Sequence, residues 1–167
     1  MMKNAVVYAA GLLMAAIILP LFIFSFPSVL GAEGAYVVQT GSMEPEIPTG
    51  SIILVYSEEP ENIEEGDVIA FYSKVNDRFV RITHRVVDRS WTGERYIYRT
   101  KGDALQFSDR QWVPEENVIG EVRYTSTVFG LLIRTYRDRN IFFGVMIIIS
   151  SLIIIDRIRI GMEEKNF

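Results

Sequence analysis

The chain has 167 residues and a formal net charge of -4, so it can form one compact domain and lacks the basic excess that nucleic-acid binding requires. It contains no cysteine and a single histidine, which excludes disulfides, thiolate metal sites, cysteine nucleophiles and multi-histidine metal centres. Apolar residues make up 49% of the chain and concentrate at its two ends, a distribution that indicates a membrane protein.

The first element in the chain is an uncharged stretch at residues 5–26. Its 22 residues would form a helix about 33 Å long, enough to cross a bilayer. A cleaved signal peptide is the alternative, but the apolar part of a signal peptide usually spans only about 7–15 residues. We therefore predict a retained N-terminal transmembrane anchor over residues 1–32.

A second uncharged run, residues 141–155, lies near the other end. Its 15 residues are fewer than the roughly 20 of a usual transmembrane helix, so a buried or membrane-lying helix is the alternative. Arginines on both sides of the run fit a short span whose charged ends reach the membrane surface. We predict a second transmembrane helix over residues 140–156.

Two spans would place both termini on the same side of a membrane. Because basic residues follow the second run, that side is predicted to be the cytoplasm, with residues 157–167 as a cytoplasmic tail. Residues 33–139 would then form an extracytoplasmic domain. The predicted location is the cell membrane, or the endoplasmic reticulum membrane in a eukaryote, with a multi-pass topology.

The predicted extracytoplasmic domain carries short apolar segments separated by Gly, Pro and Asn, which is typical of antiparallel strands. The predicted strands are Ser51–Ser57, Gly66–Ser73, Phe79–Val87, Arg95–Gly102 and Asn117–Tyr124, with a turn at Lys74–Asp77. The sequence thus predicts a mainly β fold, a small antiparallel β-barrel or sandwich that is flanked by the two transmembrane helices.

The single histidine, His84, lies in the predicted strand Phe79–Val87. It alternates with Val80, Ile82 and Val86, so it faces the apolar side of that strand. A buried, hydrogen-bonded structural histidine is one interpretation. A general base is the other, because a neutral imidazole accepts a proton near neutral pH.

A candidate nucleophile, Ser42, lies in the glycine- and proline-rich segment Val37–Ser51. Simple turn chemistry would explain the glycines and prolines of this segment. The alternative is that Pro45 and Pro48 stiffen the chain and present one hydroxyl rigidly, which catalysis rewards.

Two acidic residues, Asp103 and Asp109, lie on the polar segment Thr100–Arg110 that follows a predicted strand. They are either solvated loop residues or a partner for His84, whose tautomer one carboxylate would fix. Periodicity does not decide which of the two would do so.

Three motifs, taken together and in order, resemble type I signal peptidases. They are GSMEP at Gly41–Pro45, ITHRV at Ile82–Val86, and TKGD at Thr100–Asp103 with Asp109 beyond it. The resemblance covers roughly residues 37–124 and the first apolar stretch. It is to the branch found in archaea, in the endoplasmic reticulum and in some spore-forming bacteria, because a histidine stands where the other bacterial branch has a lysine.

The resemblance implies a role for each motif residue. Ser42 would be the nucleophile and His84 the general base, with Asp109 completing a triad-like set and Asp103 a second functionally important acid. The oxyanion site would combine the backbone N–H of Ser42 with the hydroxyl of Thr40. No metal or organic cofactor is implied.

The predicted function is a membrane-bound serine endopeptidase that removes N-terminal signal peptides from translocated preproteins. Met43 and Ile47 are expected on an apolar surface near the bilayer, where they would contact the substrate. Expected partners are signal peptides, the lipid bilayer and translocation machinery or accessory subunits. The alternatives are a non-catalytic membrane-anchored β-domain that binds a partner protein, and a Ser–Lys protease that uses Lys101.

Overall fold

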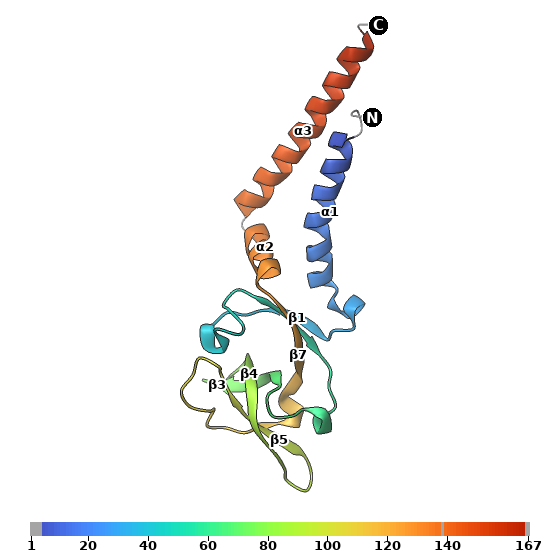
Figure 1. Cartoon of the computed structure of the whole chain (residues 1–167). Coiled ribbons are helices and arrows are strands. Elements are labelled where there is room, and N and C mark those ends of the chain that lie inside the picture. Colours follow the sequence, from blue (N-terminus) through green and yellow to red (C-terminus); the bar gives the residue numbers. More distant parts are fainter. Residues whose placement is uncertain (1–4, 138, 166–167) are drawn as a thin grey trace. The chain divides into compact units, whose positions relative to one another are not determined.

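The computed structural model describes residues 5–137 and 139–165 (Figure 1). It divides into two compact units. The first, called here the β unit, is Phe24–Leu131, and the second is a helical unit drawn from Met1–Ile23 and Leu132–Phe167. All candidate site residues belong to the β unit.

Three α-helices lie at the two ends of the chain. They are α1 (Ala5–Ser25), α2 (Thr127–Arg137) and α3 (Arg139–Lys165). Among residues 5–137 and 139–165, no helix combines the length and the apolar character that crossing a membrane requires. The two transmembrane helices predicted within residues 1–32 and 140–156 are therefore not supported. In α3 the apolar run ends at Ile155, and the helix continues through charged residues to Lys165.

The β unit is built on one antiparallel sheet with the strand order β1-β2-β7-β3-β4-β5-β6. The strands are β1 (Gly34–Val37), β2 (Ile52–Tyr56), β3 (Val68–Val75), β4 (Arg78–Trp91), β5 (Tyr96–Lys101), β6 (Val113–Pro114) and β7 (Val118–Ser126). Short 3-10 turns join them at η2 (Pro27–Leu30), η3 (Gly41–Met43), η4 (Pro60–Asn62) and η5 (Glu115–Asn117). The predicted mainly β, antiparallel fold is confirmed.

The five predicted strands correspond to β2, β3, β4, β5 and β7, whereas β1 and β6 were not predicted. β1 has four residues and β6 has two, one of them a proline, so neither carries a readable alternation. The predicted turn between β3 and β4 is confirmed. There Asn76 and Asp77 have φ values of 49° and 60°, which suits a tight hairpin turn.

The segment Ile69–Phe71 of β3 is buried on both faces, which explains the continuous apolar sequence there. Ile69 and Phe71 belong to one core cluster, together with Val86 and Tyr98. Ala70, between them in sequence, faces a second cluster. The second cluster contains Met43, Ile47, Ile53, Val55 and Ala70. The sheet therefore has one core on each side of β3.

β4 lies between β3 and β5 (Figure 1) and carries the single histidine on its buried face. His84 is 6% exposed and Val86 is 1% exposed. The ring of Phe71, on β3, meets the imidazole edge-on with 6.4 Å between the ring centroids. The predicted orientation of His84 toward the apolar side is confirmed.

Tyr98, on β5, places a polar hydroxyl group inside the core. Its side chain is completely buried, and its hydroxyl donates a hydrogen bond to Pro60 O at 2.7 Å. Burial, with the nearby Glu115 carboxylate, raises the pKa of Tyr98 from 10.0 to about 12. Because the unfolded chain ionises first, stability should fall as the pH rises from 10 to about 12.

We expect Tyr98→Phe to lower the free energy of unfolding at neutral pH by about 1 kcal/mol, because Pro60 O loses its donor. The same variant should lose less stability than wild type above pH 10, since it no longer has this ionisation. Chemical unfolding at several pH values measures both effects. Tyr72→Phe, at an exposed position, is the control, and parallel curves for wild type and Tyr98→Phe would contradict the prediction.

Candidate active site

Ser42 lies in the short turn η3, between β1 and β2. Thr40, just before η3, has an extended backbone with φ -129° and ψ 155°. After η3 the Glu44–Pro45 peptide bond is cis. Glu44 Oε1 accepts hydrogen bonds from Thr49 N at 3.2 Å and Thr49 Oγ1 at 2.9 Å, which lower the pKa of Glu44. The turn is thus closed on itself by its own side chains.

Two apolar side chains, those of Met43 and Ile47, anchor this segment in the core. Met43 is 1% exposed and Ile47 is 2% exposed, and both pack in the second core cluster with Ile53 and Val55. The prediction that Met43 and Ile47 form an exposed apolar surface is therefore wrong. In that cluster they pack with Ile53 and Val55 of β2 and Ala70 of β3, beside partly buried side chains from β1 and β7.

The hydroxyl of Ser42 points toward the hydroxyl of Thr40. Thr40 Oγ1 and Ser42 Oγ are 3.4 Å apart on the accessible side of the turn. Within residues 5–137 and 139–165, Ser42 Oγ makes no hydrogen bond to His84.

Asp109 holds His84 through the ring nitrogen Nδ1. His84 Nδ1 lies 2.7 Å from Asp109 Oδ2, and the same oxygen accepts a hydrogen bond from Thr100 Oγ1 at 2.6 Å. An ionised carboxylate only accepts hydrogen bonds, so Nδ1 carries the proton and, in the neutral ring, Nε2 is left as an acceptor. The imidazole therefore presents its basic nitrogen away from Asp109.

The basic nitrogen and the serine turn meet at Gly102. A Cβ atom at Gly102 would lie 3.1 Å from His84 Nε2 and 2.6 Å from Ser42 O. The backbone N–H of Ala104 donates to the same Ser42 O at 2.9 Å. The loop after β5 therefore touches both the serine turn and the free nitrogen of His84.

The other predicted acid, Asp103, contacts Arg85 rather than His84. Arg85 Nε and Nη2 donate to the two carboxylate oxygens of Asp103 at 2.9 and 2.7 Å. Arg85 Nη1 donates to Gly66 O at 2.8 Å. The Asp103 carboxylate raises the pKa of Arg85. Since a bidentate pair has a defined geometry, this contact ties the loop to β4 beside His84.

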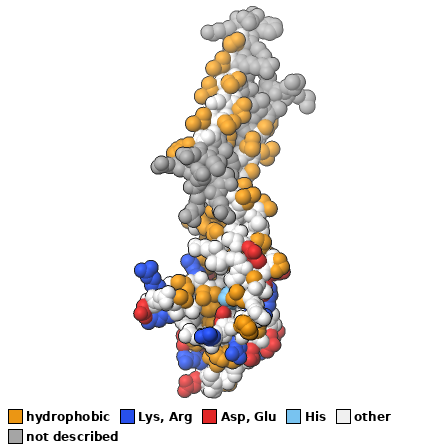
Figure 2. All heavy atoms as spheres, turned by 90° about the vertical axis from the view of Figure 1, so that its left-hand side faces the viewer, with side chains coloured by type: hydrophobic (Ala, Val, Ile, Leu, Met, Phe, Trp, Pro, Cys, Tyr) orange, Lys and Arg blue, Asp and Glu red, His pale blue; other side chains and the backbone are white. Residues whose placement is uncertain are grey.

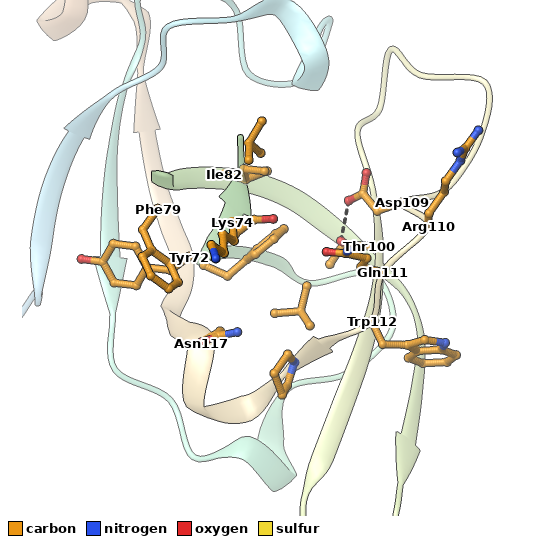
Figure 3. A pocket seen from close by; sticks show the side chains of 15 residues that line it. Tyr72, Lys74, Phe79, Ile82, Thr100, Asp109, Arg110, Gln111, Trp112 and Asn117 are labelled. Atoms are coloured by element: carbon orange, nitrogen blue, oxygen red, sulfur yellow. Dashed lines mark hydrogen bonds between the residues drawn. The ribbon is translucent and has the colours of Figure 1, made fainter. Parts of the chain in front are cut away.

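A cavity of about 370 Å³ adjoins the acidic end of this arrangement. Figure 3 shows Asp109 and Thr100 on one wall, with Tyr72, Phe79 and Lys74 across from them. The side chain of Asp109 is 30% exposed. One carboxylate oxygen is thus bound by His84 and Thr100, while the group as a whole borders open space.

The structure brings Ser42, Thr40, His84 and Asp109 to one region, with Asp103 set apart on Arg85. Figure 2 shows the imidazole as a small pale-blue surface bordered by hydrophobic side chains of the β unit. No role was predicted for Thr100 or Arg85. Thr100 alternates with the buried Tyr98 on β5, and this alternation is the signal that could have placed its hydroxyl inside.

The chain is similar to curated signal peptidases. Signal peptidase I W of Bacillus subtilis (strain 168) is 42% identical over 82 residues, which cover 48% of this chain and 42% of that protein. The signal peptidase complex catalytic subunit SEC11C of Homo sapiens is 25% identical over 130 residues, or 72% of this chain and 67% of that protein. SEC11 of Metarhizium robertsii is 31% identical over 94 residues, or 52% of this chain and 54% of that protein.

The chain thus spans between 42% and 67% of the length of these three relatives. No family model matches it. The similarities support the type I signal peptidase family, in agreement with the three motifs.

The Arg85–Asp103 contact predicts a local effect on the loop. We expect Arg85→Lys to lower the hydrogen-exchange protection of the Ala104 amide about tenfold, because an ammonium group cannot reproduce the two parallel hydrogen bonds. The exposed Arg95, which pairs with Glu116, supplies the matched control Arg95→Lys. Equal protection of Ala104 in both variants would show that the pair does not order the loop.

The close approach at Gly102 predicts a steric effect. We expect Gly102→Ala to lower the free energy of unfolding of the β unit by about 1–3 kcal/mol, because the new methyl group overlaps the Ser42 carbonyl. Fluorescence of the chain's two tryptophans, Trp91 and Trp112, reports unfolding of this unit. At Gly11 a Cβ has open space, so Gly11→Ala should not destabilise, and a harmless Gly102→Ala would refute the contact.

Proposed function

We propose that this chain is a serine endopeptidase that removes N-terminal signal peptides from preproteins, with Ser42 as the nucleophile and His84 as the general base. The observation that carries the proposal is the 2.7 Å contact between His84 Nδ1 and Asp109 Oδ2. It leaves the opposite nitrogen of the only histidine facing the segment that binds the Ser42 turn. The similarity to curated signal peptidases supplies the substrate class.

In the proposed reaction, Ser42 Oγ transfers its proton to His84 Nε2 as it attacks the substrate carbonyl carbon. The imidazolium that forms is stabilised by the Asp109 carboxylate and then protonates the leaving amine. The resulting acyl-enzyme is hydrolysed by water, which His84 activates in turn. The turn that carries Ser42 is fixed by the buried Met43 next to it, so the reaction needs movement of the serine side chain and not of the turn.

Thr40 is the proposed side-chain donor of the oxyanion site. Its hydroxyl lies 3.4 Å from Ser42 Oγ, so it is on the side where a negative oxygen would develop during attack. Together with the backbone N–H of Ser42, it would provide two donors. Loss of one such donor typically lowers kcat by about 10²–10³-fold.

Asp109 and Asp103 take different roles in this proposal. Asp109 acts on His84, whereas Asp103 acts on the loop through Arg85. The histidine between Thr83 and Arg85 supports assigning the chain to the Ser–His branch of the family, which is part of this proposal. Association with accessory subunits stays a prediction.

A Ser–Lys mechanism through Lys101 has less support. Lys101 is paired with Arg85 across the β4–β5 ladder, and its neighbour Thr100 points into the core. Because side chains alternate along a strand, Lys101 lies on the face of the sheet opposite to His84. A partner-binding β-domain without activity would give no reason for Ser42, His84 and the two aspartates to occur together.

The test is cleavage of a model preprotein by the full chain. Detergent is included because the helices expose many large hydrophobic side chains. We expect Ser42→Ala and His84→Ala to lower kcat/KM by at least about 10³-fold, since both groups act in the same step. Mass spectrometry of the products locates the cut. Lys101→Ala is the matched control and should stay near wild-type activity.

Two results would overturn the proposal. Full activity of Ser42→Ala would exclude Ser42 as the nucleophile. Loss of activity in Lys101→Ala, with activity retained in His84→Ala, would instead establish the Ser–Lys mechanism.

A further inference from the structure

We propose that Thr100 is a positioning residue for the reaction: its buried hydroxyl holds the Asp109 carboxylate in the orientation that receives His84 Nδ1. This inference rests on the proposed function, because it assigns to Thr100 an effect on the general base. It adds a fourth side chain to the set of Ser42, His84 and Asp109.

Two hydrogen bonds of opposite direction join Thr100 and Asp109. The backbone N–H of Asp109 donates to Thr100 O at 2.8 Å, and Thr100 Oγ1 donates to Asp109 Oδ2 at 2.6 Å. The second bond is the dashed line in Figure 3. Together they fix both the backbone and the side chain of Asp109 against β5, although nine positions separate Asp109 from Thr100 in sequence.

The hydroxyl of Thr100 is buried and donates its hydrogen bond to Asp109. Thr100 is 0% exposed, so its proton is shielded from solvent, and the short contact to a carboxylate is of the charge-assisted kind. Asp109 Oδ2 accepts from both His84 and Thr100. The two donors therefore select which oxygen of Asp109 faces the imidazole.

Asp109 needs such a restraint because its surroundings do not confine it. Its side chain is 30% exposed and lines the cavity of about 370 Å³ in Figure 3. Without the Thr100 hydroxyl, the carboxylate could turn toward the cavity and its water. His84 would then lose the contact that fixes its tautomer and stabilises its charged form.

Thr100 itself is rigidly placed. It pairs with Val86 across the β4–β5 ladder, two positions beyond His84 on the same buried face of β4. Its neighbour on that face of β5, Tyr98, is completely buried. The sheet thus sets the spacing between the base and the group that restrains its carboxylate.

The test compares Thr100→Val, which keeps the shape of the side chain and removes the hydroxyl, with Thr100→Ser, which keeps the hydroxyl. We expect Thr100→Val to lower kcat for preprotein cleavage about 10–100-fold with little change in KM, because it removes one hydrogen bond to a charged group. Thr100→Ser should recover most of the activity. Ser51→Ala is the matched control, since Ser51 is also fully buried and its hydroxyl lies 3.1 Å from the hydroxyl of Thr127, away from His84 and Asp109.

A second readout needs no substrate. The chain has one histidine, so the downfield proton resonance of a hydrogen-bonded Nδ1 belongs to His84 without further assignment. We expect Thr100→Val to shift or broaden this resonance, and Thr100→Ser and Ser51→Ala to leave it in place. If Thr100→Val does not fold, as judged by tryptophan fluorescence, Thr100→Ala carries the same comparison.

The outcomes separate this inference from the proposed function. An active wild type together with an unchanged kcat and resonance in Thr100→Val would overturn the role of Thr100 and leave the function standing. If wild type cleaves no preprotein, the proposed function fails. The resonance alone then decides whether Thr100 holds the His84–Asp109 pair.

Discussion

The burial of Met43 is the constraint on which the candidate site depends. Met43 follows Ser42 directly, and its side chain is inserted among Ile53, Val55 and Ala70 in the core beneath the turn. Full burial of a side chain of this size contributes about 1.5–3 kcal/mol, so Ser42 cannot move far without giving up that packing. With Met43 buried in the core, the preceding Ser42 stays at the surface and its hydroxyl is accessible. A serine on an unanchored loop would have the same chemistry but no fixed approach to His84.

The loop after β5 connects the Ser42 turn to β4, which the packing of Met43 alone does not do. Ala104 N–H donates to Ser42 O, Asp103 pairs with Arg85 of β4, and Asp109 binds His84. Gly102 lets this loop pass between the serine carbonyl and His84 Nε2, where a side chain has no space. Three segments that are distant in sequence are thus held by one loop. Disturbing any of its contacts should affect the others, as expected for neighbouring groups in one network.

The strands with clear patterns were predictable from sequence, because continuous or alternating apolar residues mark buried and half-buried strands. The orientation of His84 followed from its alternation with Ile82 and Val86. Met43 was misjudged because a single apolar residue in a proline-rich turn has no period that reveals burial. The hydroxyl contact of Thr100 was not predictable, since it depends on where the loop after β5 returns to that strand, nine positions further along the chain. The apolar ends suggested membrane spans that the described helices do not support.

The two carboxylates of the loop show why sequence spacing could not divide their roles. Asp103 and Asp109 are alike in chemistry and lie on the same segment, but their partners differ. Asp103 faces a permanently charged guanidinium, so its contact with Arg85 has the same strength whether or not a proton is being transferred. Asp109 faces an imidazole whose charge changes when it accepts a proton, so its contact strengthens as that charge appears. The neighbouring side chain, and not the acid itself, therefore decides which carboxylate supports the general base in the proposed reaction.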